Sequence, residues 1–91
     1  MVEKPIDEVD VTSILGNPYS VIIFNDSVHS MDEVVAQLMK ATGCSEIRAH
    51  QIMLGAHKTG RAIAYTGSRE RCELVESILA EIKLMTKIEQ A

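Results

Sequence analysis

Aromatic residues are scarce in this sequence, which has no tryptophan, two tyrosines and one phenylalanine among 91 residues. Proteins that bind single-stranded nucleic acid usually stack the bases on aromatic side chains. Proteins that bind a duplex need a basic surface that neutralises the phosphates, whereas this chain has a net charge of −4. We therefore expect no nucleic-acid partner.

Cysteines and long apolar segments are scarce as well. Cys44 and Cys72 lack the paired spacing of a metal or redox motif, so we expect two small buried residues in a reducing compartment. No segment approaches the roughly 18 consecutive apolar residues of a membrane span. Residues 1–10 carry four acidic side chains and no apolar run, unlike a signal peptide. These absences favour a cytoplasmic protein with no membrane partner, and nothing in the sequence indicates an oligomer, so we expect a monomer.

The length of the chain is typical of one domain, since domains usually contain about 100–150 residues. The triplet Gly16-Asn17-Pro18 has the composition of a turn and marks a boundary. We expect residues 1–17 to form a flexible N-terminal arm and residues 18–91 to form the core domain.

A strand and a capped helix open the predicted core. Residues 19–24 (YSVIIF) are β-branched and aromatic and too few for a helix, which predicts a mostly buried strand. Ser30, three residues before Glu33, matches a capping box and predicts the start of a helix that ends at Gly43. The apolar residues between them have helical spacing, and they are Met31, Val34, Val35, Leu38 and Met39.

A second helix is predicted from near Ser45 to Gly60. Its apolar face consists of Ala49, Ile52, Met53 and Ala56. A short strand over residues 61–66 is expected next, with Ile63 and Tyr65 on one face and Ala62 and Ala64 on the other. Ser68 is positioned to cap a third helix, whose predicted core face is Val75, Ile78, Leu79 and Ile82.

The C-terminal segment permits two interpretations. Leu84, Thr86 and Ile88 alternate with Met85 and Lys87, which favours a strand. No glycine or proline interrupts the segment, so the sequence agrees equally well with a third helix that continues to the end of the chain. With a final strand, the element order is β-α-α-β-α-β. Two successive helices between strands indicate an α+β fold, with a small three-stranded antiparallel sheet packed against three helices.

Polar residues follow directly after the first predicted strand. Asn25 supplies a carbonyl acceptor and Asp26 a negative charge, and together they suit a ligand with N–H groups and a positive charge. The same residues also suit an Asx turn that merely leads into the helix. The spacing by itself favours this simpler interpretation.

Histidines and methionines are the remaining candidates for chemistry. His57 lies near the end of the second helix, where the helix dipole favours a cation. His29, His50, His57 and Cys44 have no recognisable metal-ligand spacing, and a hydrolase using Asp26 and His57 would lack a nucleophile motif. We expect no metal, no cofactor and no catalytic residue. Methionines usually fill gaps in a core, but they also line adaptable apolar pockets, and those here are Met31, Met39, Met53 and Met85.

Several of these motifs together resemble the ClpS adaptor family. They are residues 19–26 (YSVIIFND), Met31, and residues 47–62 (IRAHQIMLGAHKTGRA). The resemblance covers about residues 18–66, and the rest of the chain agrees in element order.

The resemblance implies an adaptor, not an enzyme, that binds N-degrons, which are bulky apolar residues at a free N-terminus. Such adaptors deliver their substrates to an AAA+ unfoldase of the ClpA or ClpC type. It assigns Asn25, Asp26 and His57 to the α-amino group of the substrate. The side-chain pocket would comprise Met31, Val34, Leu38, Met53, Ala56 and Leu84, with Ser27 and His29 at its rim. Leu, Phe, Tyr and Trp are the expected first residues, and the bacterial cytoplasm or the plastid stroma is the expected location.

The chain departs from the family pattern at several positions. Ser27 replaces a usual second acidic residue, His29 and Ser30 replace a usual Thr-Pro pair, and Ala56 replaces a commonly larger aliphatic residue. These changes predict a different preference among bulky first residues. They also leave open a domain of the same fold that docks on the unfoldase without reading N-termini. A small metal-binding protein is a second alternative.

Overall fold

The elements of the fold follow the predicted order. The computed structural model describes residues 17–91, so the predicted N-terminal arm lies outside the described residues except for its last position. The elements are β1 (Tyr19–Phe24), α2 (Met31–Thr42), α3 (Glu46–Thr59), β2 (Arg61–Gly67), α4 (Arg69–Leu79), the short 3₁₀ helix η1 (Ala80–Ile82) and β3 (Thr86–Gln90). The α+β architecture of three helices and three strands is confirmed.

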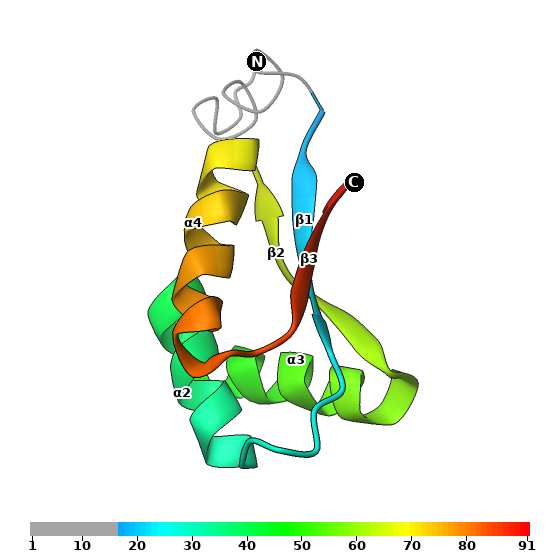
Figure 1. Ribbon diagram of the computed structural model, residues 1–91, viewed down its shortest axis with the longest axis vertical. Helices are drawn as coiled ribbons and strands as arrows, with labels where there is room; N and C mark the ends of the chain where they lie inside the picture. The colour runs from blue at the N-terminus through cyan, green and yellow to red at the C-terminus, as the bar shows by residue number, and fades with distance from the viewer. Residues whose placement is uncertain (1–16) are drawn as a thin grey trace, which may run out of the picture.

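A three-stranded antiparallel sheet forms one layer of the molecule. Its strand order is β2-β1-β3, so the first strand lies in the centre. The helices pack against one face of the sheet: α2 and α4 lie side by side, and α3 runs crosswise past one end of the strands (Figure 1). This arrangement brings the end of β1, the start of α2 and the end of α3 to the same side of the molecule.

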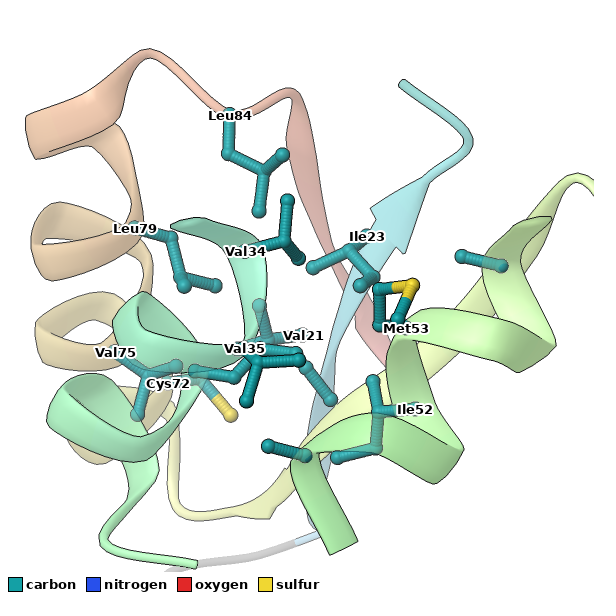
Figure 2. Packing of buried hydrophobic residues seen from close by; sticks show 14 residues of the cluster. Val21, Ile23, Val34, Val35, Ile52, Met53, Cys72, Val75, Leu79 and Leu84 are labelled. Atoms are coloured by element: carbon teal, nitrogen blue, oxygen red, sulfur yellow. The ribbon is translucent and has the colours of Figure 1, made fainter. Parts of the chain in front are cut away.

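The hydrophobic core lies between the sheet and the helices. Val21 and Ile23 contribute from β1, while Leu38 and Leu79 are fully buried on α2 and α4. Figure 2 shows these layers meeting, with Val75 and Cys72 at one end of the core and Leu84 at the other. Cys72 is buried as predicted, whereas Cys44 is only half-buried.

The helix boundaries arise from local hydrogen bonds that the sequence predicts. The Oγ atom of Ser30 accepts a hydrogen bond from the backbone N–H of Glu33 at 3.1 Å. Ser45 and Ser68 cap α3 and α4 in the same way. Gly43 and Gly60 adopt the left-handed conformation immediately after α2 and α3, where an L side chain would be strained.

The prediction that Tyr65 lies on the same face of β2 as Ile63 is wrong. The pairing of β1 with β2 shifts register between Val21 and Ile22, so one residue of β2 is extra. Such a bulge reverses the alternation of side chains beyond it. Tyr65 therefore packs against the core cluster together with Ala64, while Ile63 remains 53% exposed on the open face.

The C-terminal segment forms a strand, so continuation of the helix is excluded. Lys83 has a φ of 61° and its N–H donates to the carbonyl of Ala80, which ends the helical run. Leu84 then turns inward and is buried. β3 pairs with β1 along its whole length.

Candidate functional site

A small pocket opens where β1, α2, α3 and the segment after η1 meet. It contains about 50 Å³ of free volume, which is room for about three or four water molecules. Eleven residues line it: Ile23, Phe24, Asn25, Asp26, His29, Met31, Val34, Met53, Ala56, His57 and Leu84.

The floor of the pocket is part of the hydrophobic core. Ile23, Val34, Met53, Ala56 and Leu84 are buried and also belong to the core cluster. In Figure 2 the labelled residues of this group lie along one end of the core, between α3 and the turn that precedes β3. A core that holds these side chains in place therefore also fixes the shape of the pocket. Met31, in contrast, is 52% exposed at the mouth.

The polar mouth is formed by Asn25, Asp26 and His57. The backbone N–H of Asn25 donates to the carbonyl of Gly60 at 2.9 Å, and this bond ties the end of β1 to the end of α3. His57 lies in the last turn of α3 and is exposed. The three residues that the family resemblance groups together thus line a single pocket.

Asp26 organises the loop between β1 and α2. Its Oδ1 accepts hydrogen bonds from the backbone N–H of Val28 at 2.6 Å and of His29 at 3.0 Å. This is the Asx turn that the simpler interpretation predicts, so the same carboxylate shapes the loop and faces the pocket. Partial burial raises the pKa of the Asp26 carboxyl, but the hydrogen bonds from His29 and Val28 outweigh burial and leave the pKa below its usual value.

His29, which was predicted to lie at the rim of the pocket, is held in place by contacts on both sides of its ring. Its Nδ1 lies 2.6 Å from Oδ2 of Asp26, and its Nε2 contacts the backbone carbonyl oxygen of Ile82. The side chains of His29 and Asp26 are only 13% and 15% exposed. The hydrogen bond to Asp26 raises the pKa of His29 above its usual value, and the Ile82 carbonyl and the charges of Asp26 and Glu33 add to the rise against partial burial.

Two predicted site residues lie elsewhere. Leu38 is fully buried and is not among the residues that line the pocket, because it lies deeper along α2 in the centre of the core. Ser27 is exposed and lines a neighbouring shallow depression, together with Val28, Lys83 and Met85. This depression shares Asn25, Asp26 and His29 with the pocket.

Sequence reasoning missed three contributors to the site. Ile23 alternates with the outward-facing residues of β1, so its place on the pocket floor follows from strand periodicity. Phe24 is the last residue of the same strand. The carbonyl of Ile82 had no signal in the sequence, because 53 residues separate it from His29.

The arrangement of these residues suits the binding of a small ligand. An apolar floor beside two hydrogen-bonding polar groups and a carboxylate complements a small apolar group that carries a cation. Across residues 17–91 no three histidine, cysteine or acidic side chains lie together as metal ligands would. In the same part of the chain, no helix is long and apolar enough to cross a bilayer.

Comparisons with known proteins identify the family. The family model described as the ATP-dependent Clp protease adaptor protein ClpS matches residues 16–89. The ClpS adapter protein of Mycobacterium marinum is 35% identical over 75 residues, which cover 82% of this chain and 74% of the relative. The adapter of Mycolicibacterium paratuberculosis is 35% identical over 77 residues, covering 85% and 73%.

A solved structure agrees with the fold. Agrobacterium tumefaciens ClpS2 bound to L-phenylalaninamide superposes with a TM-score of 0.77 at 22% identity, covering 82% of this chain and 98% of ClpS2. The fold and the family match thus define a small adaptor domain. The chain belongs to the ClpS family of adaptor proteins of the ATP-dependent Clp protease.

Proposed function

We propose that this protein binds the first residue of substrates with a free, bulky apolar N-terminus and delivers them to a Clp unfoldase. The observation that carries the proposal is a single pocket with a core-anchored apolar floor and Asn25, Asp26 and His57 at its mouth. ClpS2 of Agrobacterium tumefaciens was solved with L-phenylalaninamide, a ligand that has both an α-amino group and an apolar side chain.

The polar mouth would distinguish a free N-terminus from any other residue. A terminal ammonium offers three hydrogen-bond donors and one positive charge, whereas an acylated or internal residue has a single neutral N–H. A blocked ligand would cover Asn25 and Asp26 while offering them only one neutral N–H and no positive charge. Leaving buried polar groups unsatisfied costs about 1–3 kcal/mol each, so acetylated peptides are expected to bind poorly.

The apolar floor would select the side chain. Burying a Leu or Phe side chain contributes about 1.5–3 kcal/mol, and the pocket has a small free volume of about 50 Å³. Phe, Tyr and Trp would need more room. Met31 can supply it, since it is 52% exposed at the mouth and methionine side chains are flexible. We therefore propose that Leu is preferred over the aromatic residues.

Delivery requires an unfoldase, for which a ClpA or ClpC type of AAA+ partner is proposed. The family relationship supports this partner, since the relatives are adapter proteins of the Clp protease. The segment before residue 18 is the proposed contact with the unfoldase during delivery. We propose that the adaptor works as a monomer in the cytoplasm.

Fluorescence anisotropy with short labelled peptides tests the proposal. Peptides that begin with Leu, Phe, Tyr, Trp, Ile or Ala are compared with their N-acetylated forms. Free Leu and Phe peptides are expected to bind, and acetylation is expected to abolish binding. Asp26→Asn and His57→Ala should each weaken binding by about 10–100-fold, the effect of losing a charge-assisted hydrogen bond of about 1.5–3 kcal/mol.

Two matched variants serve as controls. Asp32→Asn makes the same change of charge in the first turn of α2, and His50→Ala removes the histidine two turns before His57 on α3. Neither residue lines the pocket, so both variants should bind like the unaltered protein. Equal binding of free and acetylated peptides would refute the proposal.

A second function is favoured by one observation: the carboxylate of Asp26 is already hydrogen-bonded within the protein. If these bonds saturate it, the domain would dock on the unfoldase without reading N-termini. Binding to ClpA or ClpC together with no discrimination among the peptides would establish this alternative.

A further inference from the structure

His29 connects two hydrogen-bond acceptors from distant parts of the chain. One ring nitrogen faces the carboxylate of Asp26 at 2.6 Å, and the other faces the carbonyl of Ile82 in η1. Neither acceptor has a proton to give, because Asp26 is ionised at neutral pH and a backbone carbonyl only accepts.

The two contacts require a particular protonation state. A neutral imidazole carries one N–H, so either tautomer would point a lone pair at an oxygen atom. The imidazolium carries two N–H groups and donates to both acceptors at once. The contacts on both sides of the ring are thus compatible only with a charged His29.

We propose that His29 is a positioning residue whose imidazolium neutralises Asp26 in the unliganded protein, so that the N-terminal ammonium of a substrate binds most tightly once His29 has lost its proton. The inference rests on the proposed function, since it concerns the same α-amino site.

The geometry places the two cations in competition. Oδ1 of Asp26 already accepts from two backbone N–H groups, so an ammonium must approach the Oδ2 atom that His29 holds. Two cations on one carboxylate repel each other at close range. Loss of the His29 proton removes this repulsion and leaves the carboxylate charge for the ligand.

Each element near His29 contributes a charged or titratable side chain to its surroundings. Asp26 in the loop and Glu33 on α2 favour the charged ring. His57 on α3 faces the same pocket, and Lys83 after η1 faces the adjoining depression. A protonated His57 or a bound ammonium therefore opposes the charge on His29, whereas the two carboxylates support it.

Loss of the proton also changes the hydrogen bonds that the His29 ring donates. The neutral ring can keep its Nδ1–H bond to Asp26, so the carboxylate stays in position. The bond to Ile82 is then lost, and this bond fastens the turn that carries Leu84 to the pocket floor. Ligand binding is thus coupled to the freedom of the segment between η1 and β3.

The test is the pH dependence of peptide binding. A free Leu peptide is titrated by fluorescence anisotropy at constant ionic strength between pH 5.5 and 7.5, where its own ammonium remains largely charged. Linkage to one proton allows at most about a tenfold change per pH unit, and we expect binding about fivefold or more weaker at pH 5.5 than at pH 7.5. His29→Asn keeps a donor toward Asp26 without a titrating charge and should bind more tightly than the unaltered protein at pH 5.5. His50→Gln should retain the original profile.

The outcomes separate this inference from the proposed function. Peptide binding with the same pH profile in His29→Asn as in the unaltered protein would overturn the inference and leave the proposed function standing. No peptide binding at any pH would overturn both. Calorimetry of the unaltered protein at pH 6.5 in two buffers of different ionisation enthalpy needs no variant. It should show net proton release on binding, and proton uptake or no exchange would contradict the role of His29.

Discussion

Leu38 and Met31 lie on the same apolar stripe of α2 but in different surroundings. Leu38 is fully buried, while Met31 is 52% exposed at the pocket mouth. We expect Leu38→Ala to lower the free energy of unfolding by about 2–5 kcal/mol, the usual effect of a cavity in a core. Met31→Ala should change stability by only about 0.5 kcal/mol but weaken binding of a Leu peptide. Urea unfolding and peptide anisotropy on both variants check this contrast. A stability loss in Met31→Ala as large as in Leu38→Ala would contradict it.

At the same scale, Asp26 shows that a structural and a binding role need not exclude each other. Its Oδ1 closes the Asx turn, and its Oδ2 faces His29 beside the pocket. Asp26→Asn keeps an oxygen for the turn and removes the charge, and it is therefore the cleaner test of ligand binding than Asp26→Ala.

Among the elements, α3 is made less stable by a glycine, Gly55. This glycine lies in the helix interior, and a Cβ atom there would meet the Cβ of Ala62 at 3.5 Å, an ordinary contact distance. Gly55→Ala should therefore raise the free energy of unfolding by up to about 1 kcal/mol, since alanine loses less backbone freedom.

The matched comparison is Gly60→Ala at the end of the same helix. Gly60 has a φ of 97°, where an alanine costs about 1–2 kcal/mol. Chemical denaturation of both variants should show stability changes of opposite sign. Destabilisation by Gly55→Ala would mean that α3 and β2 pack more tightly than the distance to Ala62 indicates.

For the whole molecule, ionisation sets a pH window of greatest stability. Hydrogen bonds from Lys40 and Lys87 lower the pKa of Glu81 and Glu89 respectively, and the pKa of Asp26 is lowered too. Carboxyl groups with lowered pKa values stabilise the fold at pH values above their ordinary pKa near 4. This stabilisation is lost as the pH falls. The raised pKa of His29 acts oppositely, since its stabilisation is complete below its ordinary value of 6.5 and is lost as the pH rises through the raised value.

Stability is therefore expected to be greatest between about pH 5 and 6.5, falling in acid and also toward pH 8. Urea midpoints measured from pH 3 to pH 8 check the profile. In His29→Asn the decline on the alkaline side should disappear, whereas the acid side should remain. An unchanged alkaline decline in the variant would show that another group is responsible.

The sequence alone determined the elements from β1 to α4, because their signals act over a few residues. The serine caps at positions 30, 45 and 68 and the glycines at positions 43 and 60 use hydrogen bonds and backbone angles within one helical turn. The β-branched and aromatic composition of residues 19–24 and the helical spacing of α2 and α3 then favoured one sheet face covered by helices. The pocket residues Asn25, Asp26 and His57 followed from the family resemblance, since spacing along the chain by itself favoured only a turn.

The tertiary structure decided the relations between elements. A bulge in β2 moved Tyr65 to the core face, and the depth of α2 in the core placed Leu38 outside the pocket. Lys83 ended the helical run without a glycine or a proline. The bond from His29 to Ile82 joins residues 53 positions apart. Such contacts depend on how several elements pack together, and no local pattern in the chain encodes that packing.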